Sequence, residues 1–317
     1  MQERKPTANG VSAAARRIAA AVTRTPLLPL DWRGRRIWIK AECLQQGGSF
    51  KLRGATNRLL QLDASERAGG VVAFSSGNHA QGVALAAQRL GISATIVMPS
   101  DAPAVKMDAT RAAGAEIVPY DRATESREEI GARLAKERGS TLVPSFDDVD
   151  VIEGQGSVGV EIRDQLGRAP PMLLTPCGGG GLAAGIALAL AETTIVTVEP
   201  EGWDDMARSL EAGRIVPVEE PAPPTRCDAL QTKKVSPLTL EALGAAGARG
   251  IAVSESEVTA AMVTGFGRLR IVAEPGGAVA LAALLSGRED VPDGSVVVVS
   301  GGNVDPGLYA RILASSV

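Results

Sequence analysis

The fold of this chain can be read most directly from GGSFKLRGA, residues 47–55. This stretch places one lysine, Lys51, after a serine and an aromatic residue, at the head of a run that predicts a helix. A lysine held at a helix start and partly removed from water is suited to form a Schiff base. A lysine that begins an ordinary surface helix has the same local sequence, so further motifs must decide between the two interpretations.

Two more motifs follow apolar, strand-like runs. Residues 75–82, SSGNHAQG, form a polar loop that opens a predicted helix, and such a helix start can seat a carboxylate or simply be capped by Ser76 or Asn78. Residues 177–182, CGGGGL, let successive backbone N–H groups surround a phosphate, because no Cβ atoms interfere. A dinucleotide-binding turn is the alternative for the glycine run, and Glu199 falls near the spacing that it expects.

Composition narrows the function classes. The 317 residues carry a formal net charge of −3, which gives no basic surface for nucleic acid and no polybasic membrane patch. The three cysteines have no paired spacing, which favours reduced thiols in a cytoplasmic protein. The single histidine, His79, leaves no partners for a histidine-based zinc site, whereas an organic cofactor with its own electron sink needs no histidine base.

Strand-like runs alternate with helical patterns along the chain. This order predicts an α/β fold with mostly parallel sheets covered by helices on both faces. An amphipathic first helix is expected within residues 11–22, where no signal peptide is evident. The predicted strands are 37–42, 71–74, 94–98, 116–119, 173–175, 195–199 and 296–300, and the main predicted helices are 52–62, 80–90, 105–113, 127–137 and 181–191.

With its motifs in this order, the chain resembles the pyridoxal 5'-phosphate (PLP) enzymes of fold type II, near the threonine/serine dehydratase and serine racemase family. The resemblance runs from about Thr25 to residues 300–305, SGGNVD. It implies a tryptophan synthase β-like fold with a large PLP-binding domain, residues 1–69 and 147–317, and a small inserted domain, residues 70–146. We expect no C-terminal regulatory domain, and a homodimer that binds a small amino acid but neither nucleic acid nor membrane.

The resemblance also implies the roles of cofactor-binding residues. Lys51 would carry PLP and take the α-proton, with Phe50 beside the pyridine ring. Asn78 would hydrogen-bond the phenolic oxygen of the cofactor, and the hydroxyl of Ser300 would face the pyridine nitrogen. The cofactor phosphate would be held by Gly178, Gly179, Gly180 and Gly181.

Substrate-binding residues are implied in the same way. Arg127 and Thr232 match positions that reach the substrate. Ser76 would face the substrate α-carbon from the side opposite Lys51, where its hydroxyl can deliver or take a proton. The substrate carboxylate would be bound by the loop Ser75, Ser76, Gly77, Asn78 and His79, in which we assign His79 no proton transfer.

An acidic loop after the predicted strand 195–199 resembles the divalent-cation loop of the family. Glu199, Asp205 and the carbonyl of Trp203 would supply hard oxygen ligands that suit Mg²⁺ or Ca²⁺. A solvated acidic loop is the alternative for this segment.

Two departures leave the substrate open. Phe146 is closer to threonine dehydratases than to serine racemases, and Ala229 stands where relatives often carry glycine. The expected activity is deamination of L-threonine or L-serine to a 2-oxo acid and ammonia by α,β-elimination. Serine racemase and 3-hydroxyaspartate ammonia-lyase are the alternatives on this scaffold, and a nucleotide-dependent oxidoreductase or an inactive PLP binder are remote ones.

Overall fold

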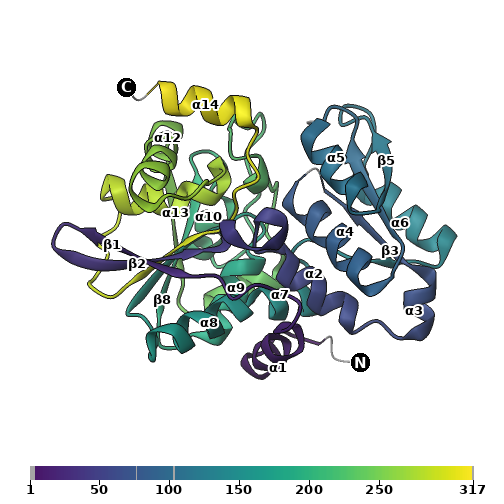
Figure 1. Cartoon of the computed structure of the whole chain (residues 1–317), viewed down its shortest axis with the longest axis horizontal. Coiled ribbons are helices and arrows are strands. Elements are labelled where there is room, and N and C mark those ends of the chain that lie inside the picture. The colour runs from purple at the N-terminus through teal and green to yellow at the C-terminus, as the bar shows by residue number, and fades with distance from the viewer. Residues whose placement is uncertain (1–3, 76, 103, 316–317) are drawn as a thin grey trace.

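The computed structural model describes residues 4–75, 77–102 and 104–315, whose strands form two sheets (Figure 1). Within this part of the chain the larger sheet has six strands, of which only β1 and β2 pair antiparallel. Their order is β1 (Leu27–Trp32), β2 (Arg35–Ala41), β10 (Val296–Val299), β7 (Met172–Pro176), β8 (Thr194–Pro200) and β9 (Arg249–Val253).

The smaller sheet is parallel throughout and comes from one continuous part of the chain. Its order is β5 (Glu116–Tyr120), β4 (Ala94–Pro99), β3 (Val71–Phe74) and β6 (Thr141–Leu142). These strands are grouped on the right of Figure 1 with α3 (Ala64–Gly69), α4 (Asn78–Leu90), α5 (Ala104–Ala112) and α6 (Arg127–Arg138). All four strands lie inside the range 70–146, whose bounds as a domain stay a prediction.

Helices cover both faces of the larger sheet, because its central strands are apolar on both sides. In β10, Val297 and Val299 pack into one core cluster, whereas Val296 and Val298 pack into the other. The first cluster includes α12 (Glu255–Thr264), α13 (Pro275–Ser286) and α14 (Pro306–Ala314). The second includes α1 (Ala8–Ile18), α7 (Val149–Gln155), α8 (Ser157–Leu166), α9 (Gly181–Ala189), α10 (Asp205–Ala212) and α11 (Pro237–Ala245).

The predicted α/β class is confirmed, and the seven predicted strands all appear with each end within two residues of the predicted one. Helix α1 buries Val11, Ala14 and Ile18 on one side, as an amphipathic helix should. Three strands were not predicted: β1 is an edge strand with a proline, β6 has two residues, and β9 is a half-buried edge. Such strands lack the long buried apolar run on which the prediction rests. No helix of the described chain is long and apolar enough to cross a membrane.

A buried ionic cluster joins the two sheets through α2 (Lys51–Leu60), which also contacts α4 and α7. The guanidinium of Arg53 is fully buried and donates to both carboxylate oxygens of Glu42 at 2.7 and 2.8 Å. It also donates to both oxygens of Glu161 at 2.7 and 2.9 Å. Lys40, likewise buried, donates to Glu161 at 2.6 Å. The two cations, Arg53 and Lys40, therefore balance the two carboxylates of this cluster. Because Arg53 comes two residues after Lys51, the cluster fixes the part of α2 that carries Lys51.

We predict that Arg53→Ala lowers the free energy of unfolding by about 3–5 kcal/mol, because it leaves Glu42 and Glu161 buried without their partner. The measurement is urea denaturation followed by circular dichroism. Arg36→Ala is the control, since Arg36 pairs with Asp31 at the surface and should cost at most about 1 kcal/mol. Equal losses in the two variants would show that the cluster does not hold α2.

Candidate active site

Lys51 is the first residue of α2, and its side chain is partly buried. Its Nζ donates a hydrogen bond of 2.8 Å to the carbonyl of Ser145 and lies 5.2 Å from the ring centroid of Phe50. Burial lowers the pKa of the Lys51 ammonium to about 8. An amine with a pKa near neutrality can serve both as a nucleophile and as a proton acceptor.

The turn before Lys51 is hydrogen-bonded to the end of β10. The amide of Phe50 donates to the carbonyl of Ser300 at 3.1 Å, and Ser49 forms an isolated bridge with Gly301. The sequence predicts that this strand ends at Ser300, whereas the structure ends it at Val299 and places Ser300 in the segment that follows. The structure thus brings Phe50, Lys51 and Ser300 together.

The glycine loop lies between β7 and the nine-residue helix α9. A Cβ atom at Gly179 would stand 2.3 Å from the ring of Phe146, and Gly180 has a φ of +89° that disfavours any side chain. Ser145, the acceptor for Lys51, directly precedes Phe146, so residues 145–146 link Lys51 to the loop. The loop presents backbone atoms at a helix start, and this cradle fits a phosphate group.

The loop of residues 75–79 opens α4, which begins at Asn78. Ser76 lies outside the described residues. The hydroxyl of Ser75 accepts a hydrogen bond of 3.2 Å from the amide of Gly77. His79 is buried with its Nε2 2.9 Å from the carbonyl of Val143, and burial together with the nearby Lys51 lowers the pKa of its imidazole to about 3. The imidazole is therefore neutral, and that it takes no part in proton transfer stays a prediction.

Glu274 and Asn303 contact Asn78 but were not predicted from the sequence as site residues. The Nδ2 of Asn78 donates to Oε1 of the buried Glu274, and its Oδ1 accepts a 2.8 Å hydrogen bond from Asn303. Both are distant in sequence from Asn78, so no local pattern connects them. An acidic residue before Pro275-Gly276-Gly277, at the start of a fully apolar helix, was the one available signal.

The two predicted substrate residues lie in different surroundings. The hydroxyl of Thr232 lies 3.1 Å from where a Cβ of Gly178 would stand, so Thr232 borders the glycine loop. Arg127 begins α6, stacks 5.7 Å from the ring centroid of Phe74 and pairs with Glu128 at 2.9 Å. Phe74 directly precedes Ser75, which places Arg127 beside the 75–79 loop, although its side chain is about 39% exposed.

The acidic loop holds two buried carboxylates. Glu199 accepts hydrogen bonds from the amides of Met206 and Ala207 at 2.9 and 2.8 Å. Neither carboxylate oxygen of Asp205 has a hydrogen-bond partner of good geometry, although the backbone amides of residues 205 and 235 and the cation of Arg208 lie near it. Burial, with each group's acidic neighbours, raises the pKa of Glu199 and raises that of Asp205 to about 7. Among the described residues no three His, Cys, Asp or Glu side chains gather as a metal site, so a cation here would need carbonyl ligands such as that of Trp203. The unpartnered oxygens of Asp205 fit such a cation.

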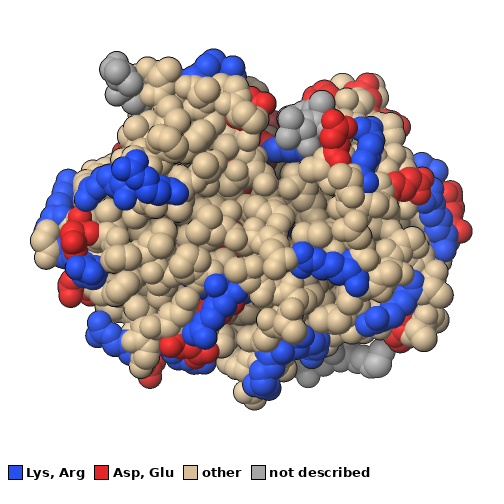
Figure 2. Space-filling model, viewed as in Figure 1, with Lys and Arg blue, Asp and Glu red and all other residues tan. Residues whose placement is uncertain are grey.

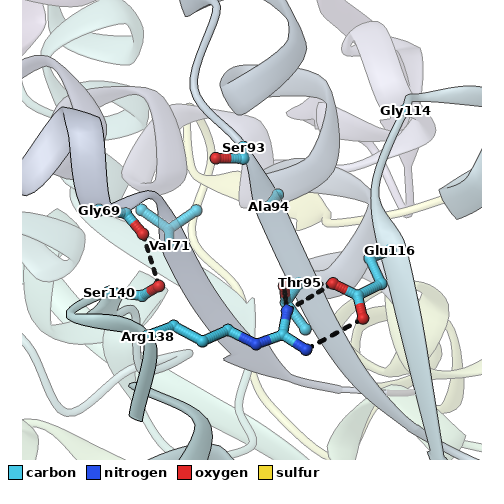
Figure 3. A pocket seen from close by; sticks show the side chains of 9 residues that line it. All are labelled: Gly69, Val71, Ser93, Ala94, Thr95, Gly114, Glu116, Arg138 and Ser140. Atoms are coloured by element: carbon cyan, nitrogen blue, oxygen red, sulfur yellow. Dashed lines mark hydrogen bonds and ion pairs between the residues drawn. The ribbon is translucent and has the colours of Figure 1, made fainter. Parts of the chain in front are cut away.

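A separate pocket of about 210 Å³ opens in the small sheet, where Arg138 and Glu116 line it (Figure 3). Arg138 donates to both carboxylate oxygens of Glu116 and to the hydroxyl of Thr95, so the charged groups satisfy one another. On the face shown in Figure 2, basic and acidic side chains lie mostly toward the edges and no large patch has one sign. Neither feature competes with the surroundings of Lys51 as a reactive site.

Comparison with known proteins agrees with this geometry. A family model described as pyridoxal-phosphate dependent enzyme matches residues 18–302. An L-threo-3-hydroxyaspartate ammonia-lyase of a Pseudomonas species is 43% identical, over 95% of this chain and 96% of the relative. A solved threonine deaminase from T.th. is 43% identical with a TM-score of 0.87, covering 95% of this chain and 99% of that one. Maize serine racemase is 34% identical with a TM-score of 0.91, covering 99% and 98%.

We predict that Gly179→Ala destabilises the protein by about 1–3 kcal/mol, because the added methyl group overlaps the ring of Phe146. The measurement is thermal unfolding without any added ligand. Gly244→Ala is the matched control, since nothing lies within 4 Å of its added Cβ and alanine favours the helix α11. A Gly179 variant as stable as the control would mean that the close approach of Phe146 to the loop is not needed.

Proposed function

Because this chain belongs to the family of pyridoxal-phosphate dependent enzymes, we propose that it is an ammonia-lyase acting on a β-hydroxy amino acid. The products are a 2-oxo acid and ammonia, and L-threonine and L-serine are the first candidate substrates. The observation that carries the proposal is the partly buried Lys51, with its lowered pKa, beside a side-chain-free glycine loop. The family match removes the support for a nucleotide-dependent oxidoreductase.

When bound, PLP supplies an electron sink that stabilises negative charge at the substrate α-carbon. Lys51 would hold it covalently, and the backbone amides of Gly178, Gly179, Gly180 and Gly181 would bind its phosphate. Phe50 lies beside the amine of Lys51, and its amide is hydrogen-bonded to Ser300. Asn78 supplies a polar group beside Gly301, the residue after Ser300. A hydroxyl such as that of Ser300, unlike a carboxylate, does not enforce a positive charge on a ring nitrogen, and this favours elimination over transamination.

The substrate enters next to Lys51 and the 75–79 loop. The start of α4 favours its carboxylate. Arg127 lies against Phe74, just before this loop, and Thr232 borders the glycine loop. Lys51, whose lowered pKa makes the free amine available, removes the proton from the α-carbon. The hydroxyl on the neighbouring carbon then takes up a proton, for which the ammonium that Lys51 has become is a donor, and leaves as water. Hydrolysis of the resulting enamine by a second water gives the 2-oxo acid and ammonia. Ser76 is proposed as the acid or base on the opposite face, a role that rests on sequence alone.

A second candidate substrate is 3-hydroxyaspartate, on which the Pseudomonas relative acts according to its name. Its additional carboxylate requires a cation in the site. Lys106 is such a cation, since its Nζ lies 3.9 Å from where a Cβ of Gly77 would stand, and it pairs with Asp228. The likeness to maize serine racemase keeps racemisation as a further candidate activity.

We also propose the bounds of two domains, an assembly, a location and a bound cation. The large domain consists of residues 1–69 and 147–317, and the small domain of residues 70–146. A homodimer in the cytoplasm is supported by three large hydrophobic side chains that the described chain leaves exposed, Leu44, Phe266 and Val272, and by three free buried cysteines. A Mg²⁺ or Ca²⁺ ion held by Glu199, Asp205 and the Trp203 carbonyl is supported by the unpartnered oxygens of Asp205.

The proposed function is tested with a panel of L- and D-serine, L- and D-threonine and the 3-hydroxyaspartates, scored for both keto acid and enantiomer. We predict an absorbance band at about 410–430 nm that disappears on borohydride reduction. Lys51→Ala should lose this band and lower turnover by several orders of magnitude, because it removes both the covalent anchor and the base. Lys136→Ala, on α6, is the control that should keep both. An unchanged spectrum in the Lys51 variant, or no turnover of any panel member by the loaded wild type, would contradict the proposal.

The metal proposal predicts that Ca²⁺ or Mg²⁺ raises the melting temperature of EDTA-treated protein. A cation that binds only the folded state at 100 times its Kd adds about 2.7 kcal/mol of stability. Asp205→Asn should abolish the shift, whereas Asp204→Asn, which changes the adjacent and partly exposed carboxylate, should keep it. If neither ion moves the wild-type melting temperature, the acidic loop binds no cation.

A further inference from the structure

Glu274 is a buried acid whose carboxylate is only partly hydrogen-bonded. It precedes the first residue of α13, yet its carboxylate makes no capping hydrogen bond to that helix. Its side chain turns instead to Asn78, and its second oxygen, Oε2, has no hydrogen-bond partner. A buried polar atom without a partner is costly, so its presence beside the candidate site calls for a functional account.

Glu274 is one end of a chain of hydrogen bonds that fixes the amide of Asn78. The carbonyl of Gly47 can only accept, so Asn303 must direct its Nδ2 toward it, at 2.8 Å. The same Nδ2 donates to Oδ1 of Asn78, which leaves the Nδ2 of Asn78 to donate to Glu274. One N–H of Asn78 is then left with a defined direction, and this is the group expected to meet the phenolic oxygen of PLP.

The charged and titratable groups that face Glu274 come from several elements. Asp228, from η3 (Asp228–Leu230), opposes a negative charge on Glu274, and Lys106 of α5 favours it. The thiols of Cys43 and Cys227 also face it, and burial raises the pKa of both to about 12, which keeps them neutral. Burial, the largest effect, and Asp228 raise the pKa of Glu274 from its ordinary value of 4.5 to about 7.

We propose that Glu274 is a positioning residue that orients Asn78 toward the cofactor and takes up a proton when PLP binds. This inference rests on the proposed function. PLP brings a phosphate and a phenolic oxygen into the site, and added negative charge favours the neutral form of a nearby acid. Solvent supplies the proton, which binds a carboxylate oxygen of Glu274. No other bond to the acid is made or broken.

The thermodynamic linkage between proton uptake and PLP binding gives the direction in which PLP affinity changes with pH. If binding is accompanied by proton uptake, PLP affinity must fall as pH rises through the pKa of Glu274 in the cofactor-free protein, which is about 7. One proton corresponds to at most about a tenfold loss of affinity per pH unit. The cofactor-free protein follows the same logic: between pH 4.5 and about 7 the folded state binds more protons at this site than the unfolded state. Its stability therefore declines across this window.

The experiment measures the Kd of PLP by fluorescence titration between pH 6 and 9, in wild type and in Glu274→Gln. Glutamine keeps an oxygen that accepts from Asn78 but cannot titrate. PLP and Lys51 titrate equally in both proteins, so the difference in slope isolates Glu274. We expect the wild type to lose affinity above pH 7 more steeply than the variant, by up to about tenfold per pH unit. Glu241→Gln, an exposed acid paired with Lys5, is the control and should follow the wild type.

Two further measurements make the inference falsifiable. Asn303→Ala frees Oδ1 of Asn78 without changing charge, so it should weaken PLP binding about equally at every pH. Cofactor-free Glu274→Gln should lose less melting temperature between pH 5 and 7 than the wild type does. Parallel pH profiles of wild type and Glu274→Gln, for both PLP affinity and melting temperature, would overturn the role of Glu274. If the pH profiles are parallel but the wild type binds PLP and turns over substrate, the proposed function stands without the role of Glu274. Failure of the wild type to bind PLP would overturn both the proposed function and the role of Glu274.

Discussion

Arg53 and Lys51 share one turn of α2, and the site depends on this arrangement. The guanidinium of Arg53 is buried between Glu42, which follows β2, and Glu161 of α8, and Lys40 completes the balance of charge. An arginine presents its donors in a rigid fork, so two bidentate pairs fix the position and rotation of the helix that carries it. Lys51 comes two residues earlier, on the opposite side of the helix. The ionic cluster thus holds a reactive amine at a fixed place between the two sheets.

The groups around Lys51 come from segments that are far apart in the chain, and each reaches the site by backbone geometry. Ser300 arrives at the carboxyl end of β10, the glycine loop follows β7, and Asn78 opens α4 after β3. β10 and β7 are neighbouring parallel strands of the larger sheet, so their carboxyl ends meet at one edge, which is where ligands bind in open α/β folds. β3 belongs to the smaller sheet, and Asn78 reaches this edge from that sheet through its hydrogen bond with Asn303. Close approach then requires glycine: a side chain at Gly179 would overlap Phe146, and one at Gly301 would overlap Glu274.

Much of this could be predicted from sequence, because buried parallel strands are continuous apolar runs and the loop after β7 is a run of glycines. Lys51, the glycine loop and Asn78 could be proposed as site residues because each lies in a dense local motif. Glu274 and Asn303 could not, since they contact Asn78 only after residues 196 and 225 positions apart are packed together. The partners of Arg53 and the unpartnered state of Asp205 were hidden for the same reason: pairing of buried charges is set by tertiary contacts, not by spacing. The exposure of Arg127 could not be judged from sequence either.

The central claim is that Lys51 alone among the lysines carries the cofactor. Its most direct test is borohydride reduction of the PLP-loaded protein, followed by proteolysis and mass spectrometry of the peptides. The account predicts that the reduced pyridoxyl group is found on the peptide containing Lys51, and that cleavage after this residue is blocked. Recovery of the group on Lys40 or Lys106, or of an unmodified Lys51 peptide from fully loaded protein, would contradict it.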